Sequence, residues 1–421
     1  MAEIALNSPS LVTKLARAAM NASERFSHKY SPMQGIRVTN PKLFTPYALR
    51  AVTFPNRVIV SPMCQYAAQQ GEVQEWHLAH HARFALSGVG GAVVEATSVT
   101  EDGRITPGCL GIWHDGQIEG LSRIVKLYHD QGIPVGIQIG HAGRKASSAL
   151  PWDGAGPLDA STQAWATVAP SALPHMAGWP TPRALAESEI AIIVEAFAEG
   201  ARRAVRAGFD FIEIHGAHGY LIHSFFSPLA NRRADSYGGS LHNRMRFALE
   251  VTRAVRTAIP TDMPLVYRIS AVDNDPAGLT IGDSITLAKE LKIFGVDLMD
   301  VSSGGIAGPV ARNPVAQFPG YQVPFSAEIR AGADIATMAV GMITTAEQAE
   351  KVLEDGQADL IALGRELLAN PAFAYGAAQA LGMDAPSSVL PRAFAFYLAR
   401  RDQARLQKQN DQARQSPNGS T

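Results

Sequence analysis

Residues 190–215 read IAIIVEAFAEGARRAVRAGFDFIEIH, and this stretch indicates the fold. Gly208 separates two kinds of pattern. Before it, apolar residues recur at the spacing of one helix face, and after it the run FDFIEIH is typical of a buried strand. The sequence therefore predicts a helix that passes through a glycine directly into a strand. The apolar helix face consists of Ile190, Ile193, Val194, Phe197, Ala201, Ala204 and Val205.

The same helix–glycine–strand transition recurs around Gly295 and Gly356. Near-continuous apolar runs, typical of strands covered on both faces, occupy residues 57–61, 91–95, 134–139, 209–215, 265–269, 296–301, 336–340 and 360–363. Eight βα units in series predict an α/β fold with a single closed domain, the (β/α)8 or TIM barrel. An open doubly wound sheet is the alternative. Its first strand normally leads into a Gly-rich phosphate turn, whereas here Pro62-Met-Cys-Gln65 follows.

The barrel is expected to span residues 38–400. Residues 147–181, after the third strand, are rich in Pro, Gly and Ser and too long for an ordinary connection. We interpret them as a rim insertion over the active site, with an inert surface insertion as the alternative. Residues 1–37 form an N-terminal extension, for which an organelle presequence is the less favoured reading because of Glu3 and Glu24. The polar residues 401–421 are expected to be a disordered tail.

Composition excludes several classes of protein. The chain has 421 residues and a formal net charge of −1, so no basic excess indicates a nucleic-acid partner. No apolar run is long enough to span a membrane. Cys64 and Cys109 are too few for a disulfide framework, a zinc ribbon or a four-cysteine iron–sulfur site. A cytoplasmic enzyme without a metal site is the resulting expectation.

Catalytic groups of such barrels lie at the C-terminal ends of the strands. Here those ends are polar, glycine-rich and cationic, and they contain no carboxylate pair suited to glycoside hydrolysis. They carry Ser61–Cys64, Ala96, Thr97, Gln138, His215, Arg268, Ser302–Gly305, Gly341, Gly364 and Arg365. His77, His80 and His81 lack the zincin pattern and are expected in the core or on the surface rather than on a metal.

The most informative stretch is His215-Gly-Ala-His218-Gly-Tyr220. Two imidazole N–H donors that converge on a carbonyl oxygen would polarise a conjugated C=C bond, as an oxyanion hole does. The phenol of Tyr220 could donate a proton. A His-x-x-His pair alone is common in protein cores, but its position at the end of the fourth strand favours a catalytic role.

The ends of the seventh and eighth strands predict a phosphate site. Gly341 and Gly364 can expose backbone N–H groups there, and Arg365 adds a guanidinium. Gln138 could hydrogen-bond the edge of a flat heterocycle. Arg268 could stabilise an electron-rich ring, or could instead form an ion pair in the barrel floor. Together these residues suit FMN.

Over residues 38–400 the chain resembles the old yellow enzyme family, in particular its bacterial, thermophilic-like branch. The resemblance rests on several motifs in the same order. They are Ser61-Pro-Met-Cys-Gln-Tyr66, Gly140-His-Ala-Gly-Arg-Lys145, His215-Gly-Ala-His218-Gly-Tyr220, Ser227-Pro-Leu-Ala-Asn231, Asp235-Ser-Tyr-Gly-Gly-Ser240, Phe318-Pro-Gly-Tyr-Gln322, Ala339-Val-Gly-Met-Ile-Thr344 and Gly364-Arg-Glu-Leu367.

The resemblance implies an FMN-dependent ene-reductase that takes hydride from NADPH or NADH. It would pass hydride from flavin N5 to the C=C bond of α,β-unsaturated carbonyl or nitro compounds. Tyr66, His215 and His218 would bind the substrate and Tyr220 would protonate it. In a homodimer or homotetramer, Tyr397 or Arg400 would reach the neighbouring site. Tightly, non-covalently bound FMN would contact Ser61, Pro62, Met63, Cys64, Ala96, Gln138, Arg268, Gly304, Gly341, Gly364 and Arg365.

Other flavin proteins are the alternatives. A quinone or nitro reductase, or a flavin-binding protein without turnover, would share these motifs. Dienoyl-CoA-reducing or amine-oxidising relatives carry a cysteine cluster, which two cysteines cannot supply. A tRNA-modifying flavin barrel would need a basic surface.

Overall fold

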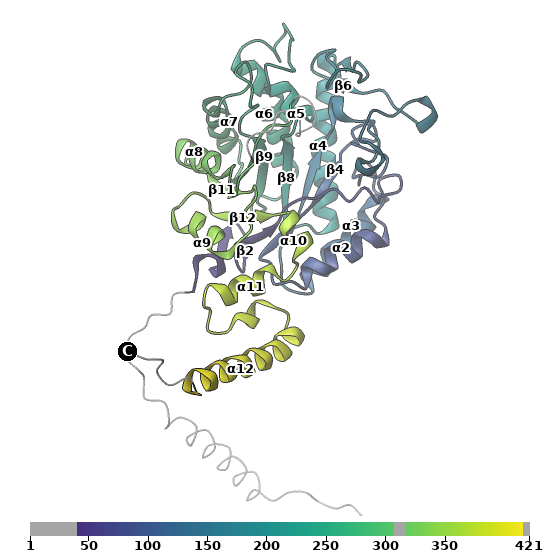
Figure 1. Cartoon of the computed structure of the whole chain (residues 1–421). Helices are drawn as coiled ribbons and strands as arrows, with labels where there is room; N and C mark the ends of the chain where they lie inside the picture. The colour runs from purple at the N-terminus through teal and green to yellow at the C-terminus, as the bar shows by residue number, and fades with distance from the viewer. Residues whose placement is uncertain (1–39, 307–316, 416–421) are drawn as a thin grey trace, which may run out of the picture. The chain divides into compact units, whose positions relative to one another are not determined.

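The computed structural model describes residues 40–306 and 317–415. Eight parallel strands form a closed barrel, in which the last strand pairs with the first (Figure 1). The predicted (β/α)8 barrel is therefore confirmed, and each predicted run contains or overlaps one barrel strand. The strands are β3 (Val58–Val60), β4 (Gly91–Ser98), β5 (Val135–Gly140), β8 (Phe211–Gly216), β9 (Leu265–Ser270), β10 (Leu298–Ser302), β11 (Ala336–Ala339) and β12 (Leu360–Leu363).

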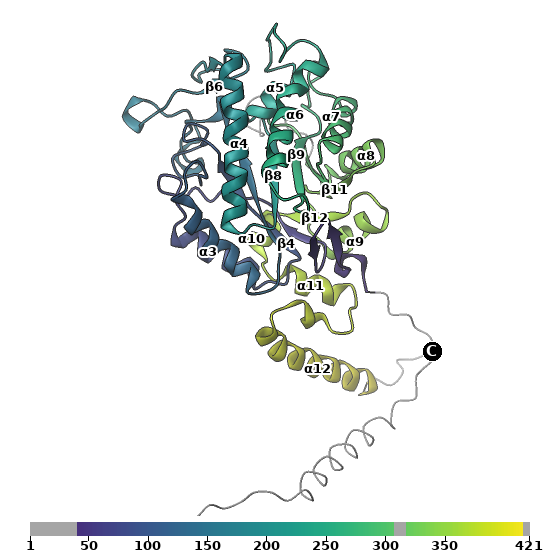
Figure 2. The same cartoon turned by 180° about the vertical axis from the view of Figure 1, so that it is seen from behind.

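Helices surround the barrel (Figure 2). The quoted helix is α4 (Glu187–Ala207), and its C-cap Gly208 has a φ of 93°, a left-handed conformation that suits glycine. The short helix α5 (Leu221–Phe226) follows β8. The other helices of the barrel region are α2 (Glu75–Ala85), α3 (Gln117–His129), α6 (Leu241–Ala258), α7 (Ile281–Ile293), α8 (Val323–Ala333), α9 (Ala346–Glu354), α10 (Arg365–Ala369) and α11 (Phe373–Ala380).

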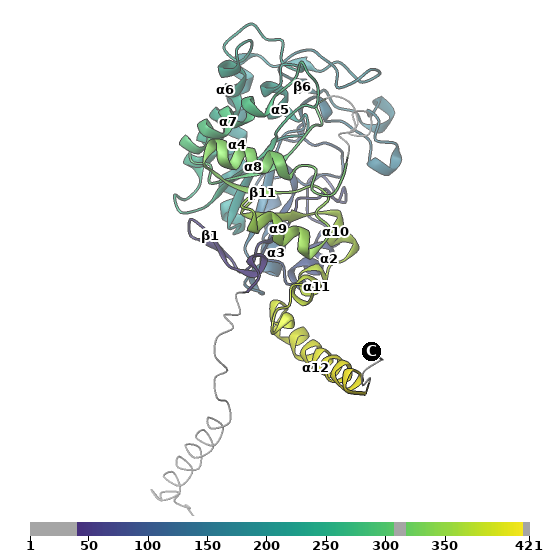
Figure 3. The ribbon, with the colours of Figure 1, turned by 60° about the vertical axis from the view of Figure 1, so that its left-hand side comes forward.

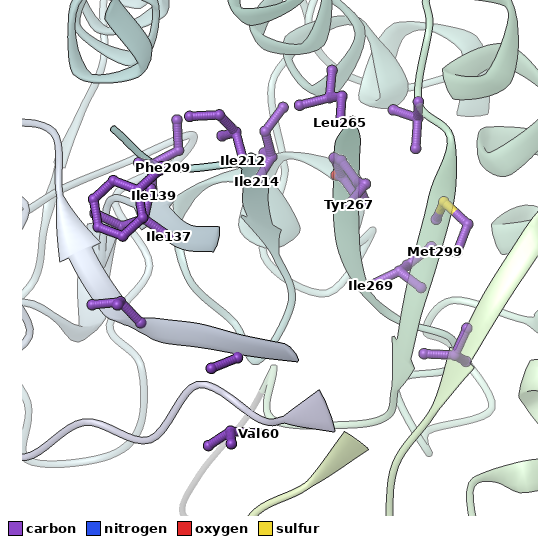
Figure 4. Close-up of a cluster of buried hydrophobic side chains, with 14 of the residues drawn as sticks. Val60, Ile137, Ile139, Phe209, Ile212, Ile214, Leu265, Tyr267, Ile269 and Met299 are labelled. Carbon is purple, nitrogen blue, oxygen red and sulfur yellow. The ribbon is translucent and has the colours of Figure 1, made fainter. Parts of the chain in front are cut away.

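Alternation along the strands separates two environments. Ile212 and Ile214 of β8 belong to an apolar core that also contains helix residues such as Phe197. Figure 4 shows part of this buried cluster, with Ile212 and Ile214 labelled. Phe211, on the opposite face of β8, belongs to a second apolar cluster with Phe54. Phe54 ends the hairpin of β1 (Tyr47–Leu49) and β2 (Val52–Phe54). Because side chains alternate, the later residues on the face of Phe211 are the polar Glu213 and His215.

The predicted rim insertion contains short ordered elements. They are η3 (Pro151–Asp153), η4 (Ala160–Thr162) and β6 (Val168–Ala169), and β6 pairs with β7 (Arg183–Ala184) just beyond the insertion. The ring of Trp152 lies edge-on to Tyr66, with 5.8 Å between the centroids. The insertion therefore reaches a residue that was predicted to bind the substrate.

The C-terminal segment differs from the prediction. Helix α12 (Arg392–Gln415) includes residues 401–415, which were expected to be disordered (Figure 3). The segment is rich in the helix formers Ala, Arg and Gln, and Asp402 accepts a hydrogen bond of 2.7 Å from the Tyr375 hydroxyl. Residues 416–421 and the extension at 1–37 lie outside the described residues. Within the described ranges, no helix is both long and apolar enough to cross a membrane.

Candidate active site

A layer of polar side chains crosses the barrel interior below the strand ends. Strand register places Gln138 of β5 beside Glu213 of β8, and Arg268 of β9 beside Asp300 of β10. All four residues are buried. The prediction included Gln138 and Arg268 but missed both carboxylates, which lie within apolar runs. Glu213 could have been found from the sequence, because it lies two residues before the predicted site residue His215 and therefore on the same face of the strand.

Arg268 combines the two roles that the sequence left open. Its Nε lies 3.3 Å from Asp300 Oδ2, and its Nη1 donates a hydrogen bond of 3.4 Å to Ser61 Oγ. Burial raises the pKa of Asp300, while Arg268 opposes that rise. Arg268 therefore forms an ion pair in the barrel and also reaches the end of the first barrel strand.

Glu213 orients the side-chain amide of Gln138. Its Nε2 donates a hydrogen bond of 2.6 Å to Glu213 Oε1. Burial, reinforced by Asp300, raises the pKa of Glu213 to about 8, although Arg268 and Gln138 oppose the rise. Since the amide donor of Gln138 points to Glu213, the amide oxygen is the atom that remains for a ligand. Gln138 thus presents an acceptor suited to a ring N–H group.

A cavity of about 460 Å³ lies where the seventh and eighth barrel strands end. Two arginines and one carboxylate, Glu366, are among its lining residues, which gives it a positive balance of charge. Gly341 has a φ of 118°, and a Cβ there would lie 2.7 Å from Gln322 Nε2, so glycine is required. Four predicted cofactor residues line this cavity: Arg268, Gly341, Gly364 and Arg365.

The residues at this cavity fit FMN. Gly364 is the N-cap of α10, and Gly364 and Arg365 line the cavity, so the first turn of α10, whose N–H groups have no partner within the helix, adjoins it. Arg268 links this cavity to the interior layer, where Gln138 offers its amide oxygen. A phosphate at one end and a hydrogen-bonding ring at the other match this distribution of donors and acceptors.

The structure brings His215, His218 and Tyr220 together. The two imidazole centroids are 5.2 Å apart with an interplanar angle of 85°, and the phenol ring lies 4.8 Å from the His215 ring. His215, Tyr220 and Ala96 line one small cavity. Two histidines and one phenol therefore share a compact space at the end of β8.

Hydrogen bonds fix the proton of His215. Its Nδ1 accepts a hydrogen bond of 3.2 Å from the backbone N–H of Ala217, so the neutral ring carries its proton on Nε2. Burial, together with the nearby Arg268, lowers the pKa of His215 well below its usual range. His215 is therefore a neutral N–H donor at physiological pH.

His218 is engaged differently. Its Nε2 lies 2.8 Å from Ser302 Oγ, and that hydroxyl donates a hydrogen bond of 3.3 Å to Gln322. Burial and Arg268 also lower the pKa of His218 well below its usual range. The ring is neutral, and its Nε2 is engaged by Ser302 rather than left open for the substrate that the prediction assigned to His218.

Backbone strain gathers at the site. Tyr66, His218 and Met342 are non-glycine residues in the left-handed region, with φ of 54°, 60° and 50°. Such conformations persist where surrounding contacts enforce them, and they are frequent at functional sites.

Burial raises the pKa of Tyr220 well above its usual range, with Cys64 adding to the rise. The phenol therefore keeps its proton at neutral pH.

Cys64 is a thiol rather than a thiolate. Burial and the neighbouring Glu95 raise its pKa well above the usual range. Glu95 is itself buried, and its carboxylate accepts a hydrogen bond of 2.9 Å from the backbone N–H of Gln65. Glu95 is a further residue that the sequence interpretation missed, because it lies inside the second apolar run.

Lys145 was quoted within a motif but given no role. Its ammonium group donates a hydrogen bond of 2.7 Å to the backbone oxygen of His218 and another to that of Gly305. Burial, with Arg144 nearby, lowers the pKa of Lys145 to about 7. Lys145 therefore ties the His218 turn to the loop after β10, next to Gly304.

Tyr397 and the histidines of α2 lie outside the cluster of His215, His218 and Tyr220. Tyr397 is 71% exposed on α12, at the end of the barrel opposite α5 and β6 (Figures 1 and 2). His77 and His81 are buried in α2, where His81 Nδ1 lies 2.9 Å from the Tyr128 hydroxyl, as expected for core histidines. Within one chain, Tyr397 is not part of the His215–Tyr220 cluster.

A cavity with two arginines at the ends of the last two strands is where barrels bind phosphorylated cofactors, so the fold and site define a cofactor-dependent barrel enzyme. Residues 42–383 match the model of the NADH:flavin oxidoreductase / NADH oxidase family. The chain belongs to this family and is a flavin oxidoreductase, which confirms the predicted enzyme class.

Individual relatives agree with this assignment. The NADPH dehydrogenase of Geobacillus thermodenitrificans is 49% identical over 346 residues, which cover 82% of this chain and 96% of the relative. Morphinone reductase in complex with tetrahydroNAD has a TM-score of 0.67 at 28% identity, covering 82% of this chain and 92% of the other. The old yellow enzyme homologue from Zymomonas mobilis has a TM-score of 0.64 at 26% identity, covering 79% and 90%. The resemblance to the old yellow enzyme family is thereby confirmed.

Proposed function

We propose that the chain is an FMN-dependent ene-reductase that takes hydride from NADPH or NADH and reduces the C=C bond of α,β-unsaturated carbonyl or nitro compounds. The observation that carries this proposal is the cluster of two neutral imidazoles and one protonated phenol. N–H donors suit an electron-withdrawing oxygen, and a phenol O–H suits the carbon that must gain a proton. Relatives named NADPH dehydrogenase and a neighbour that binds tetrahydroNAD support a nicotinamide reductant.

FMN would be held non-covalently between the cavity and the interior layer. The flavin, when bound, supplies two-electron hydride chemistry. Gly341, Gly364 and Arg365 would bind its phosphate, and Gln138 and Arg268 its ring. The remaining proposed contacts lie at the ends of the first, second and sixth barrel strands: Ser61, Pro62, Met63, Cys64, Ala96 and Gly304.

The protein side chains would then act on the substrate. His215, with its free Nε2–H, would donate to the substrate oxygen and stabilise the negative charge that develops there. His218 would join it by exchanging its contact with Ser302 for the substrate. Tyr66 would contact the same oxygen, and Tyr220 would deliver its proton to the neighbouring carbon. The rim insertion would limit the access of water, with Trp152 against Tyr66.

The assembly and location belong to the same proposal. Phe394, Phe396 and Tyr397 are exposed aromatic residues near the start of α12. They suit contact with a second copy in a homodimer or homotetramer, in which Tyr397 would approach the partner's substrate. Both cysteines are free thiols, which fits the reducing cytoplasm.

Glu213 provides a test of the cofactor site. We expect Glu213→Leu to weaken FMN binding roughly 5–30-fold, since an orphaned Gln138 donor costs about 1–2 kcal/mol. Glu213→Gln is the matched control, because its amide oxygen can still accept from Gln138. The dissociation constant is measured by the quenching of FMN fluorescence on titration with apoprotein. Equal affinity of the leucine and glutamine variants would contradict this role of Glu213.

Turnover tests the proposed activity. The purified protein should consume NADPH or NADH without oxygen when 2-cyclohexenone is added, and form cyclohexanone in equal amount. Consumption with 1,4-benzoquinone or a nitroaromatic compound, but not with the enone, would identify a quinone or nitro reductase instead. If the protein binds flavin but turns over none of these acceptors, it would be a flavin-binding protein without catalytic activity toward them.

A further inference from the structure

The turn that carries His218 and Tyr220 is held by side chains that the proposed chemistry does not use. Residues 217–220 connect β8 to α5, and His218 and Gly219 both adopt left-handed backbone conformations, with φ of 60° and 76°. Because two consecutive left-handed residues are unfavourable without support, outside contacts must define the shape of this turn.

Each polar backbone group of His218 and Gly219 has a side-chain partner. The His218 N–H donates to Ser270 Oγ at 2.9 Å, and its oxygen accepts from Lys145 at 2.7 Å. The Gly219 N–H donates to His223 Nδ1 at 2.8 Å, and its oxygen accepts from Ser224 Oγ at 2.9 Å. His223 is therefore one of four anchors of the turn.

His223 is itself fixed by a buried carboxylate. Since its Nδ1 accepts from Gly219, the neutral ring carries its proton on Nε2, which lies 2.9 Å from Asp273 Oδ1. The side chains of both residues are fully buried. Asp273 also accepts from the Ser227 hydroxyl at 2.6 Å and from the backbone N–H of Leu279 at 2.9 Å. Three donors thus hold the carboxylate in one orientation.

We propose that His223 is a positioning residue: held by Asp273, it sets the turn that places the His218 ring and the Tyr220 hydroxyl. This inference rests on the proposed function, because it assigns the turn a task in enone reduction. His223 lies in the first turn of α5, three residues after Tyr220, and links the turn to the loop after β9. A shift of the turn by about 1 Å would misplace both groups, and such misplacement can cost about 10²-fold in rate.

The test compares His223→Leu with His223→Gln. Leucine fills the space but offers no hydrogen bond, whereas the glutamine oxygen can accept from Gly219 while its NH₂ donates to Asp273. We expect His223→Leu to slow enone-driven reoxidation of the reduced flavin at least about tenfold, and His223→Gln to stay within about threefold of wild type. His81→Leu is the matched control, since it removes a buried helical histidine with one side-chain partner, Tyr128, and should leave the rate unchanged.

A wild-type rate in folded His223→Leu, or equal slowing in His223→Gln, would overturn the proposal. Should His223→Leu not fold, Asp273→Leu decides, because leucine fills a similar space but removes the oxygen that accepts from His223. A wild-type rate in that variant would also overturn the proposal.

A binding measurement separates this proposal from the proposed function. The oxidised enzyme is titrated with 4-nitrophenolate, whose oxygen can accept from the two histidines without turnover, and the flavin difference spectrum is followed. Binding at least about tenfold weaker in His223→Leu than in His223→Gln supports positioning by His223, and equal binding contradicts it. If the wild-type flavin is not reoxidised by enone, the proposed function fails on its own.

Discussion

Replacement of His215 by alanine is expected to lower the rate of enone reduction by about 10²–10³ while FMN stays bound. His215 Nε2 carries the proton of a neutral ring whose Nδ1 is occupied by the backbone N–H of Ala217. It is thus an oriented donor, whereas the corresponding nitrogen of His218 faces Ser302. We therefore expect His218→Ala to have the smaller effect of the two.

The measurement is the rate at which 2-cyclohexenone reoxidises the anaerobically reduced flavin, with bound FMN determined from absorbance. His215→Asn is the matched control, because its amide can restore one N–H donor and part of the rate. Near-normal reoxidation in His215→Ala would contradict a polarising role for His215. Loss of FMN from the variant would instead place His215 in the cofactor site.

Replacement of Tyr220 by phenylalanine is expected to slow enone reduction by about 10²–10⁴ and to leave flavin reduction by NADPH intact. Phenylalanine keeps the ring that packs 4.8 Å from His215 and removes only the hydroxyl. Because burial holds the pKa of Tyr220 well above its usual range, the wild-type group is a phenol that can donate its proton at neutral pH.

Two stopped-flow experiments separate the half-reactions, one with NADPH and one with enone. The wild-type enone step should also slow in D₂O, and that solvent isotope effect should change in Tyr220→Phe. Equal loss of both half-reactions in the variant would remove the proton-donor role. An acceptor that needs no carbon protonation, such as 1,4-benzoquinone, should reoxidise wild type and variant alike.

The barrel was predictable because strands buried on both faces leave apolar runs with clear ends. The glycines that end helices marked the same boundaries, as Gly208 shows. The proximity of residues at strand ends was predictable for a related reason, since a closed parallel barrel places the C-terminal ends of all its strands on one face. His215 and Arg268, far apart in sequence, became neighbours through the register of β8 and β9.

Other features depend on contacts that the sequence does not display. Glu213 and Asp300 are visible as residues, but only strand register shows that they hold Gln138 and Arg268. The contact between His218 and Ser302 arises from two left-handed residues in a turn. For residues 401–415 the predicted disorder was wrong, because polar composition was taken for disorder although these residues favour a helix that Tyr375 helps to anchor.

Anaerobic reduction of the flavin followed by its reoxidation tests directly whether this family member reduces activated C=C bonds. The purified protein is reduced with one equivalent of NADPH, and the flavin absorbance is followed as 2-cyclohexenone is added. We expect the oxidised spectrum to return rapidly, with one equivalent of cyclohexanone formed. A flavin that NADPH reduces and that stays reduced in the presence of the enone would show that the protein is not an ene-reductase for this substrate class.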